Sequence, residues 1–456
     1  MHTNDMTQGR PLQLILRFAL PMLIGNVFQQ VYNIVDTMAA GYILGDNAIA
    51  AIGATTSLYG LLVNFAMGLN SGCGIVVARS FGAKDRERLK RSVASMIILD
   101  AAVTTALTLL SLLFLRRLMA AMNVPAGIFS QAYAYISVIV FGMAMTVLYN
   151  LCSGILQALG NSRTPLYFLI FSSLLNLALD LLFVAVFGWG VRGAAAATIA
   201  AQAVSGGLCG VYLLHNYRDF LPSFRHFRIE GPLLREMAAT GASMAVMLCV
   251  VDLGSVFYQR AINDLGSTLI TAHTAARKII GLFMMPLASL ATANSTFVSQ
   301  NWGAGKYRRI RMTLRKVLAL QVLWGVFSCV LVWLLGGKAV IWLTNTQSSE
   351  VLSNAVFSIR LHFLFYPALG ILLAQRTALQ AMGEKVIPVC SSSLELLGKL
   401  AAGLWLIPRW GYLWVCLTEP IVWSACMLFL ALVFLLRSPL KRIEQQKGKV
   451  NEDGIL

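Results

Sequence analysis

Charged residues are scarce in this sequence, and no stretch of it has the composition of a water-soluble domain. Asp, Glu, Lys and Arg make up 12% of the 456 residues, whereas soluble globular domains average about 25%. Apolar runs of about 18 residues or more recur along the chain, and each is long enough to cross the hydrocarbon core of a bilayer as a helix. The composition therefore excludes a soluble protein and predicts an integral, multi-pass membrane protein.

The sequence also lacks the motifs of metal, redox and nucleotide chemistry. The eight cysteines are scattered through apolar runs, and the five histidines form no H-E-x-x-H spacing. The stretch GAGKY at 303–307 has the lysine of a phosphate-binding loop but neither its leading glycine nor its final Ser or Thr. We therefore expect no enzymatic activity and no cofactor.

Apolar windows, read against the residues that break helices, predict an all-α polytopic membrane protein with twelve transmembrane helices. The first six lie over 12–40, 48–78, 92–115, 129–157, 165–187 and 192–214. The second six lie over 233–263, 269–299, 313–335, 354–382, 387–407 and 412–436. A polar loop at 219–232 would then join an N-terminal lobe, 1–218, to a C-terminal lobe, 233–456.

The basic residues fall mainly in alternate connections between the predicted spans, such as 79–91 and 306–316. Lys and Arg favour the cytoplasmic side of a membrane, so both termini are expected to be cytoplasmic. A topology signal explains the net charge of +17 without a nucleic-acid partner, and we expect none. The compact length and the lack of organelle signals favour a bacterial inner membrane.

The two halves of the chain are related in sequence. The segments that match are 45–91 with 266–312, 156–165 with 379–388, and 189–190 with 410–411. Because each half crosses the membrane an even number of times, we expect two pseudo-symmetric six-helix bundles related by an axis along the membrane normal. A central cavity between such repeats is typical of transporters.

Acidic residues inside the predicted spans need an explanation, because an ionised carboxylate near the middle of a bilayer costs about 2.5–3.5 kcal/mol. They are Asp36, Asp100, Asp180, Asp252, Glu395 and Glu419. Ser172 and Asn176 precede Asp180 by eight and four residues, so all three share one helical face. Thr198 and Gln202 lie one turn apart in the following span.

Carboxylate, amide and hydroxyl oxygens suit a small cation such as Na⁺, or a shared proton. Two carboxylates that meet in an apolar setting also favour each other's protonation. Asp36 and Asp180 are therefore interpreted as chargeable groups. Asn176 and Thr198, taken alone, are better explained by hydrogen bonds to a backbone or to a neighbouring helix.

Four short stretches carry a resemblance to a known family: QQVYNIVDTMAAGYILG at 29–45, GAKD after the second span, QALG after the fourth and NLALD in the fifth. The chain resembles the MATE family (multidrug and toxic compound extrusion) over its whole length. The resemblance implies that Asp36, Asn176, Asp180 and Thr198 bind the coupling ion, H⁺ or Na⁺. It also implies a secondary active antiporter that exports amphipathic, often cationic, compounds across the membrane. The partners that we expect are these small molecules and membrane lipid, and we expect a monomer.

The remaining polar residues of the spans leave alternatives open. Gln29, Tyr32, Gln202 and Asp252 are expected to line a substrate cavity. Glu395 and Lys399, spaced i, i+4, form either an internal ion pair that neutralises its own charge or a gating or substrate site.

A flippase for lipid-linked saccharides or other lipids, built on the same fold, is the alternative function. Its cavity should carry several basic residues for a diphosphate. The candidates are Arg260, Arg277, Lys278, Arg376 and Lys399. A flippase predicts that these side chains converge on the cavity, whereas a drug antiporter predicts that they extend toward its edges.

Overall fold

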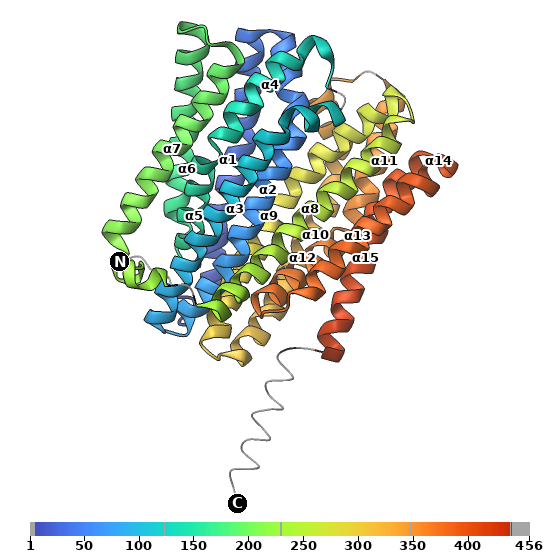
Figure 1. Ribbon diagram of the computed structural model, residues 1–456. Coiled ribbons are helices and arrows are strands. Elements are labelled where there is room, and N and C mark those ends of the chain that lie inside the picture. Colours follow the sequence, from blue (N-terminus) through green and yellow to red (C-terminus); the bar gives the residue numbers. More distant parts are fainter. Residues whose placement is uncertain (1–4, 123, 229, 347, 438, 440–456) are drawn as a thin grey trace, which may run out of the picture. The chain divides into compact units, whose positions relative to one another are not determined.

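A computed structural model describes residues 5–122, 124–228, 230–346, 348–437 and 439, and for residues 33–41, 46 and 437 it describes only the backbone (Figure 1). Over these residues the chain forms helices and no strand. The first half contains α1 (Pro11–Leu44), α2 (Asp46–Gly82), α3 (Arg86–Ala121), α4 (Ala126–Phe141), α5 (Met143–Ala158), α6 (Arg163–Asp180), η1 (Leu181–Val186) and α7 (Gly190–Asn216). Two short 3-10 turns, η2 (Arg218–Phe220) and η3 (Phe224–Phe227), lead to the second half.

The second half repeats this order of elements. It contains α8 (Gly231–Asn263), α9 (Ser267–Gly303), α10 (Tyr307–Thr344), α11 (Ser349–Leu364), α12 (Tyr366–Ala381), α13 (Val386–Ala401), η4 (Ala402–Leu406), α14 (Ile407–Trp410) and α15 (Tyr412–Arg437). Ten spans are long and apolar enough to cross a membrane, and two bent helix pairs bring the number to twelve. The predicted all-α fold with twelve spans in two related six-helix bundles is confirmed.

The fourth span of each half is bent, although the sequence predicted one continuous helix at both places. α4 meets α5 at 45° around Gly142, and α11 meets α12 at 50° around Phe365. A Cβ on Gly142 would lie 2.4 Å from a side-chain carbon of Ile199, so the close contact with α7 requires glycine here. In the second half Pro367 follows the bend, and proline cannot donate the backbone hydrogen bond of a continuous helix.

The fifth span of each half contains a π-helical stretch in its second part. α6 continues into η1 after Asp180, and α13 continues into η4 after Ala401. π-helical turns are rare, and they are found frequently at functional sites. Their recurrence at matched places in the two halves makes this part of each fifth span a candidate region for function.

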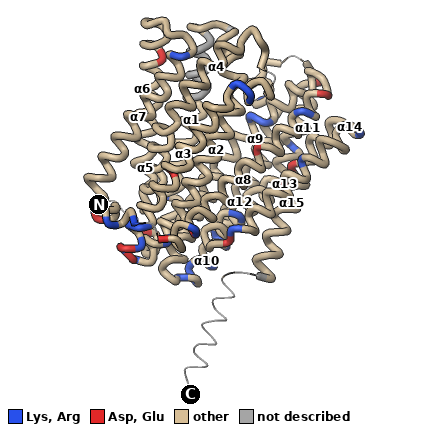
Figure 2. The backbone as a smooth tube through the Cα atoms, viewed as in Figure 1, with Lys and Arg blue, Asp and Glu red and all other residues tan. Residues whose placement is uncertain are grey.

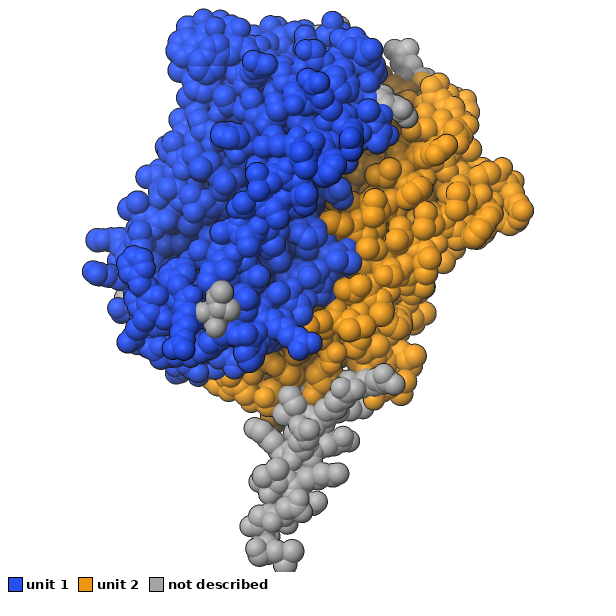
Figure 3. All heavy atoms as spheres, in the orientation of Figure 1, with its two compact units in different colours: residues 1–5, 20–248 blue, residues 6–19, 249–456 orange. Residues whose placement is uncertain are grey.

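The chain divides into two compact units (Figure 3). Unit 1 comprises Met1–Asp5 and Leu20–Leu248, and unit 2 comprises Met6–Ala19 and Cys249–Leu456. The boundaries fall inside α1 and α8, so each of these helices contributes to both units. The segment from Met6 to Ala19 therefore packs with the second half of the chain.

Within unit 1, α2 and the first part of α8 approach closely at glycine. A Cβ on Gly72 would lie 2.5 Å from the carbonyl oxygen of Thr240 and 2.6 Å from the Cα of Gly241. Both neighbours are backbone atoms, which cannot rotate away. Small residues at such contacts let transmembrane helices pack backbone to backbone.

Gly72→Ala is expected to destabilise unit 1, because the added methyl group must push α8 away from α2; overpacking of this kind costs about 1–3 kcal/mol. Gly74 lies two residues along the same helix with nothing within 4 Å of its Cβ position, so Gly74→Ala is the matched control. Thermal denaturation of both purified variants tests this expectation. Equal melting temperatures would contradict it.

Candidate functional site

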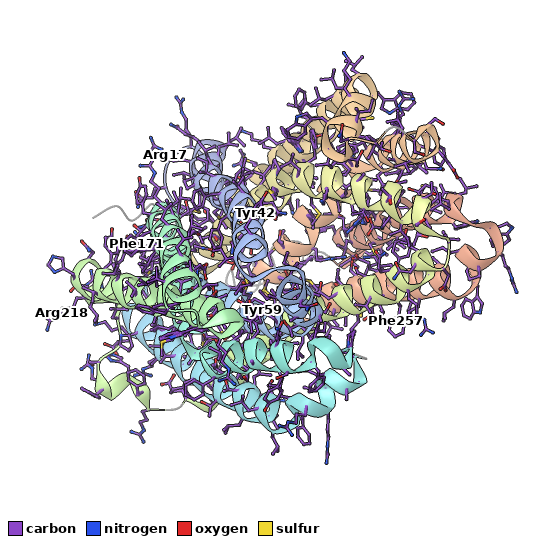
Figure 4. The ribbon with its side chains drawn as sticks, turned by 90° about the horizontal axis from the view of Figure 1, so that it is seen from above. Arg17, Tyr42, Tyr59, Phe171, Arg218 and Phe257 are labelled. Carbon is purple, nitrogen blue, oxygen red and sulfur yellow. The ribbon has the colours of Figure 1, made fainter. Side chains whose placement is uncertain are left out.

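The polar face of α6 is buried within unit 1. Ser172, Asn176 and Asp180 are 3%, 4% and 5% exposed, whereas the neighbouring Phe171, labelled in Figure 4, is 44% exposed. The helical period alone produces this arrangement, since positions i, i+4 and i+8 fall on one side. The structure therefore places a carboxyl and an amide on the inner side of the span, one turn apart.

α7 packs against α6 and carries the next polar residues. The hydroxyl of Thr198 donates to the carbonyl oxygen of Ala194, one turn earlier in the same helix, at 3.1 Å. The buried Oε1 of Gln202 and the buried Nδ2 of Asn176 have no hydrogen-bond partner among the described residues. Unused donors and acceptors in an apolar interior are costly, and they mark places where a ligand or water supplies the missing partner.

α1 carries the other expected members of the site. The backbone of Asp36 is helical, but its side chain lies outside the described residues, so the predicted meeting of Asp36 with Asp180 stays a prediction. Gln29 is exposed and Tyr32 is half-buried on the same helix. No group of three or more His, Cys, Asp and Glu side chains is placed to hold a metal ion among the residues whose side chains are described.

Asp100 is a second buried acid of unit 1, on α3. Its carboxylate accepts a hydrogen bond of 2.9 Å from the amide of Asn70 on α2. A Cβ on Gly154 of α5 would lie 2.3 Å from the amide oxygen of Asn70, so the glycine leaves room for this pair. Asp100 is thus held by a neighbouring helix within the core of unit 1.

In unit 2, Glu395 and Lys399 belong to a larger buried charge network, defined here as Arg277, Arg376, Glu395, Lys399 and Glu419. The Lys399 ammonium lies 3.3 Å from Glu395 and 3.5 Å from Glu419. It also donates to the hydroxyl of Ser255 on α8 at 3.1 Å. The predicted i, i+4 pair is present, but it is one contact of several.

The two arginines of the network lie on other helices and form ion pairs with its carboxylates. Arg376 on α12 lies 3.3 Å from Glu395, and Arg277 on α9 lies 2.5 Å from Glu419 on α15. Four of the five side chains are less than 10% exposed, and Arg277 is 44% exposed. With three cations against two carboxylates, the network carries a single excess positive charge.

A buried histidine borders the network. His362 Nδ1 lies 2.8 Å from the carbonyl oxygen of Ser358, and because a carbonyl only accepts, Nδ1 carries a proton. The other ring nitrogen, Nε2, lies 3.6 Å from Glu419. His362 therefore faces the carboxylate with a lone pair when it is neutral and with an N–H when it is protonated.

Sequence reasoning missed Arg376 and Glu419 as partners of Glu395 and Lys399, although the internal repeat contains the signal. Each matched segment of the first half differs from its partner by a constant residue number. When that difference is applied to nearby residues, polar positions of the first half pair with polar positions of the second. The matched positions are Ser172 and Glu395, Asn176 and Lys399, and Thr198 and Glu419. The charge network thus occupies the places in unit 2 that the α6 and α7 polar residues occupy in unit 1.

Asp252 lies on α8, at the part of that helix that belongs to unit 2, and is half-buried. Of the other basic candidates in this half, Arg260 and Lys278 are exposed. The other three, Arg277, Arg376 and Lys399, come together around the carboxylates of Glu395 and Glu419. Three of the five basic candidates are therefore held by carboxylates within the unit.

Comparisons with known proteins agree with this architecture. The family model described as MatE matches residues 21–182 and 243–399. The chain is 26% identical over 351 residues to a probable multidrug resistance protein, YoeA of Bacillus subtilis (strain 168), covering 75% of this chain and 76% of that protein. It is 24% identical over 405 residues to a FAD transporter of Shewanella oneidensis, covering 86% and 88%. A crystal structure of MATE in the bent conformation superposes with a TM-score of 0.89 at 21% identity, covering 97% of this chain and 99% of that one, so the fold is shared.

Proposed function

The chain belongs to the MatE family, and from that membership we propose that it is a secondary active antiporter exporting amphipathic, cationic compounds in exchange for H⁺ or Na⁺. The family match confirms the resemblance found in the sequence, and with the apolar helices it establishes a multi-pass membrane protein. Several relatives are named as multidrug resistance or multidrug export proteins. The family consists of transporters, and its activity is the movement of small molecules rather than catalysis.

The buried face of α6 is the observation that supports ion coupling. Asp180 is 5% exposed inside the span Arg163–Val186, where a permanent charge is expensive. Asn176 supplies an amide one turn before Asp180. The π-helical stretch begins at Leu181, directly after Asp180. A carboxyl group in such a place is inexpensive only when a proton or a cation neutralises it.

The proposed transport cycle follows from the free-energy cost of keeping a buried carboxylate charged. The exported compound binds while Asp36 and Asp180 are ionised, and loading of H⁺ or Na⁺ at these residues rearranges α1 and favours release outside. Exchange of one proton for one monovalent cation moves no net charge. It therefore runs on the ion gradient alone, with about tenfold accumulation per pH unit. We place both termini in the cytoplasm and the protein in a bacterial inner membrane.

The alternative, a flippase for lipid-linked saccharides, requires basic side chains that remain available for a diphosphate. Arg277, Arg376 and Lys399 are each within 3.5 Å of a carboxylate in unit 2. A substrate diphosphate would have to displace those carboxylates or leave them facing its own negative charge. This arrangement favours export of cations over flipping of anionic lipids.

Transport by the purified protein in proteoliposomes tests the proposal. Ethidium movement is followed by fluorescence while a pH gradient or a Na⁺ gradient is imposed separately, with the membrane potential held at zero. We expect one of the two gradients to drive ethidium against its own gradient. Movement that follows neither gradient would reject ion-coupled export.

A further inference from the structure

A basic pocket opens at the start of α10, within unit 2. Its volume is about 510 Å³, and its lining includes Lys306, Arg308, Arg309 and Lys316 together with Pro11 of α1. In Figure 2, Lys and Arg segments gather near the label of α10. Among the residues that the structure describes, none that lines this pocket is acidic.

Pro11 lines the pocket, and the residues just before it already engage two of the four cations. The Lys306 ammonium donates to the carbonyl oxygen of Thr7 at 2.8 Å, and Arg309 donates to those of Met6 and Gln8 at 3.2 and 3.3 Å. Arg308 and Lys316 are exposed and form no ion pair within the described part of the chain. Two full positive charges are thus left facing the pocket region.

The first unit provides an internal comparison, because α3 begins at the matched place in the repeat. Lys306 and Arg308 correspond there to Asp85 and Glu87. Asp85 accepts a hydrogen bond from the backbone N–H of Arg88 at 2.9 Å, which caps α3. Glu87 binds Arg225 at 3.1 Å. The two acids are replaced by bases in unit 2.

Two basic residues at the start of α3 are also paired in unit 1. Arg88 lies 3.1 Å from Glu236, and Arg91 forms an ion pair with Glu230. At the position matching Arg91, α10 carries Met312, which is 51% exposed. The start of α3 is therefore partly neutralised by acidic partners, whereas the start of α10 carries no acid at the matched positions and presents an apolar side chain beside its basic residues.

The length of α10 places this pocket at a membrane surface. Its 38 residues extend about 57 Å at 1.5 Å per residue, nearly twice the roughly 30 Å of hydrocarbon. All the basic residues of the pocket precede Val317, where a long apolar run begins. Lys316 therefore lies at the boundary between the headgroup region and the hydrocarbon.

We propose that this pocket binds the phosphate headgroup of an anionic phospholipid, with Arg308 and Lys316 as its principal ligands. Basic pockets at the ends of transmembrane helices bind such headgroups, cardiolipin among them. Met312 lies on the same face of α10, one turn from each of the two cations, and it supplies an apolar surface for the glycerol and upper acyl region. The backbone carbonyls of residues 6–8 hold Lys306 and Arg309 without neutralising their charge.

The test uses the full chain purified in detergent and titrated with cardiolipin, phosphatidylglycerol or phosphatidylcholine, with bound lipid counted by native mass spectrometry. We expect the anionic lipids to bind in preference to phosphatidylcholine. In the double variant Arg308→Gln, Lys316→Gln, cardiolipin affinity should fall about 30-fold, as expected for the loss of two surface cations. The charge-conserving variant Arg308→Lys, Lys316→Arg should keep most of the affinity.

A matched control removes two basic residues from the corresponding helix of unit 1. Arg86→Gln with Lys90→Gln should leave cardiolipin affinity within about twofold, a difference below the roughly 1 kcal/mol of a single surface cation. Equal losses in both double variants, or no preference of the wild type for anionic lipid, would overturn the proposal. Pyrophosphate is the soluble probe: displacement of cardiolipin by low concentrations of it would show a soluble-anion site and would also overturn the lipid assignment.

Discussion

Asp180→Asn is expected to reduce ion-driven ethidium efflux to the level of cells that lack the transporter. Asparagine keeps the size and polarity of the side chain, but it neither takes up a proton nor carries the charge that attracts Na⁺. Because the asparagine would bind neither H⁺ nor Na⁺, the ion gradient could not drive transport through this position of α6. The measurement is ethidium efflux from energised cells, normalised to the amount of protein in the membrane.

The same variant separates a coupling role from a structural one. If Asp180 only packed, its replacement would lower the melting temperature along with transport. We expect the melting temperature to stay the same or rise, because an amide costs less to bury than a carboxylate. Asp264→Asn changes an exposed acid beyond the end of α8 and should leave efflux intact. Wild-type efflux in Asp180→Asn would refute ion coupling at this residue.

Much of the fold was predictable because it depends on local patterns. The apolar runs and their breakers gave the spans, since a helix that crosses a bilayer must satisfy its backbone internally over a known length. The shared burial of Ser172, Asn176 and Asp180 follows from the helical period in the same way. The bends at Gly142 and Phe365 were not predicted, because they depend on close contacts with other helices, such as that of Gly142 with Ile199.

The charge network shows where sequence patterns stop being sufficient. The i, i+4 spacing identified Glu395 with Lys399, but Arg376 and Glu419 lie on other helices and meet them only through tertiary packing. No periodicity within one helix predicts such a contact. The internal repeat does point to it, since Glu419 occupies the place of Thr198, and an explicit comparison of the two halves would have grouped these positions.

The repeat also divides the chemistry between the two units. Unit 1 carries a buried carboxyl beside amides and hydroxyls, a set whose charge changes when a proton or cation binds. Unit 2 carries opposite charges at the positions that match Ser172, Asn176 and Thr198, whereas the position that matches Asp180 is Gly403. On the proposed function, the duplicated fifth and sixth spans have diverged into an ion-exchanging site in unit 1 and a structural charge network in unit 2.

Glu419→Gln is expected to cause the largest loss of stability of any single substitution in unit 2. Glu419 is 4% exposed and is contacted by Arg277 at 2.5 Å and Lys399 at 3.5 Å. Removing one partner of a buried ion pair leaves uncompensated charge in a medium that solvates it poorly, which costs about 3–5 kcal/mol. Arg277, which is 44% exposed, reaches solvent or lipid headgroups more readily, so most of the cost should fall on the buried Lys399.

A second variant tests whether the loss of stability comes from the unpaired Lys399. Adding Lys399→Met to Glu419→Gln removes one cation with one anion and restores the single excess charge of the wild type. We expect the double variant to be more stable than Glu419→Gln alone, with a coupling free energy of about 1–3 kcal/mol in a double-mutant cycle. Glu350→Gln, at an exposed position in the first turn of α11, should cost less than about 1 kcal/mol. Additive effects of Glu419→Gln and Lys399→Met would show that the two side chains do not stabilise each other, and that the network is an arrangement of neighbours rather than an energetic unit.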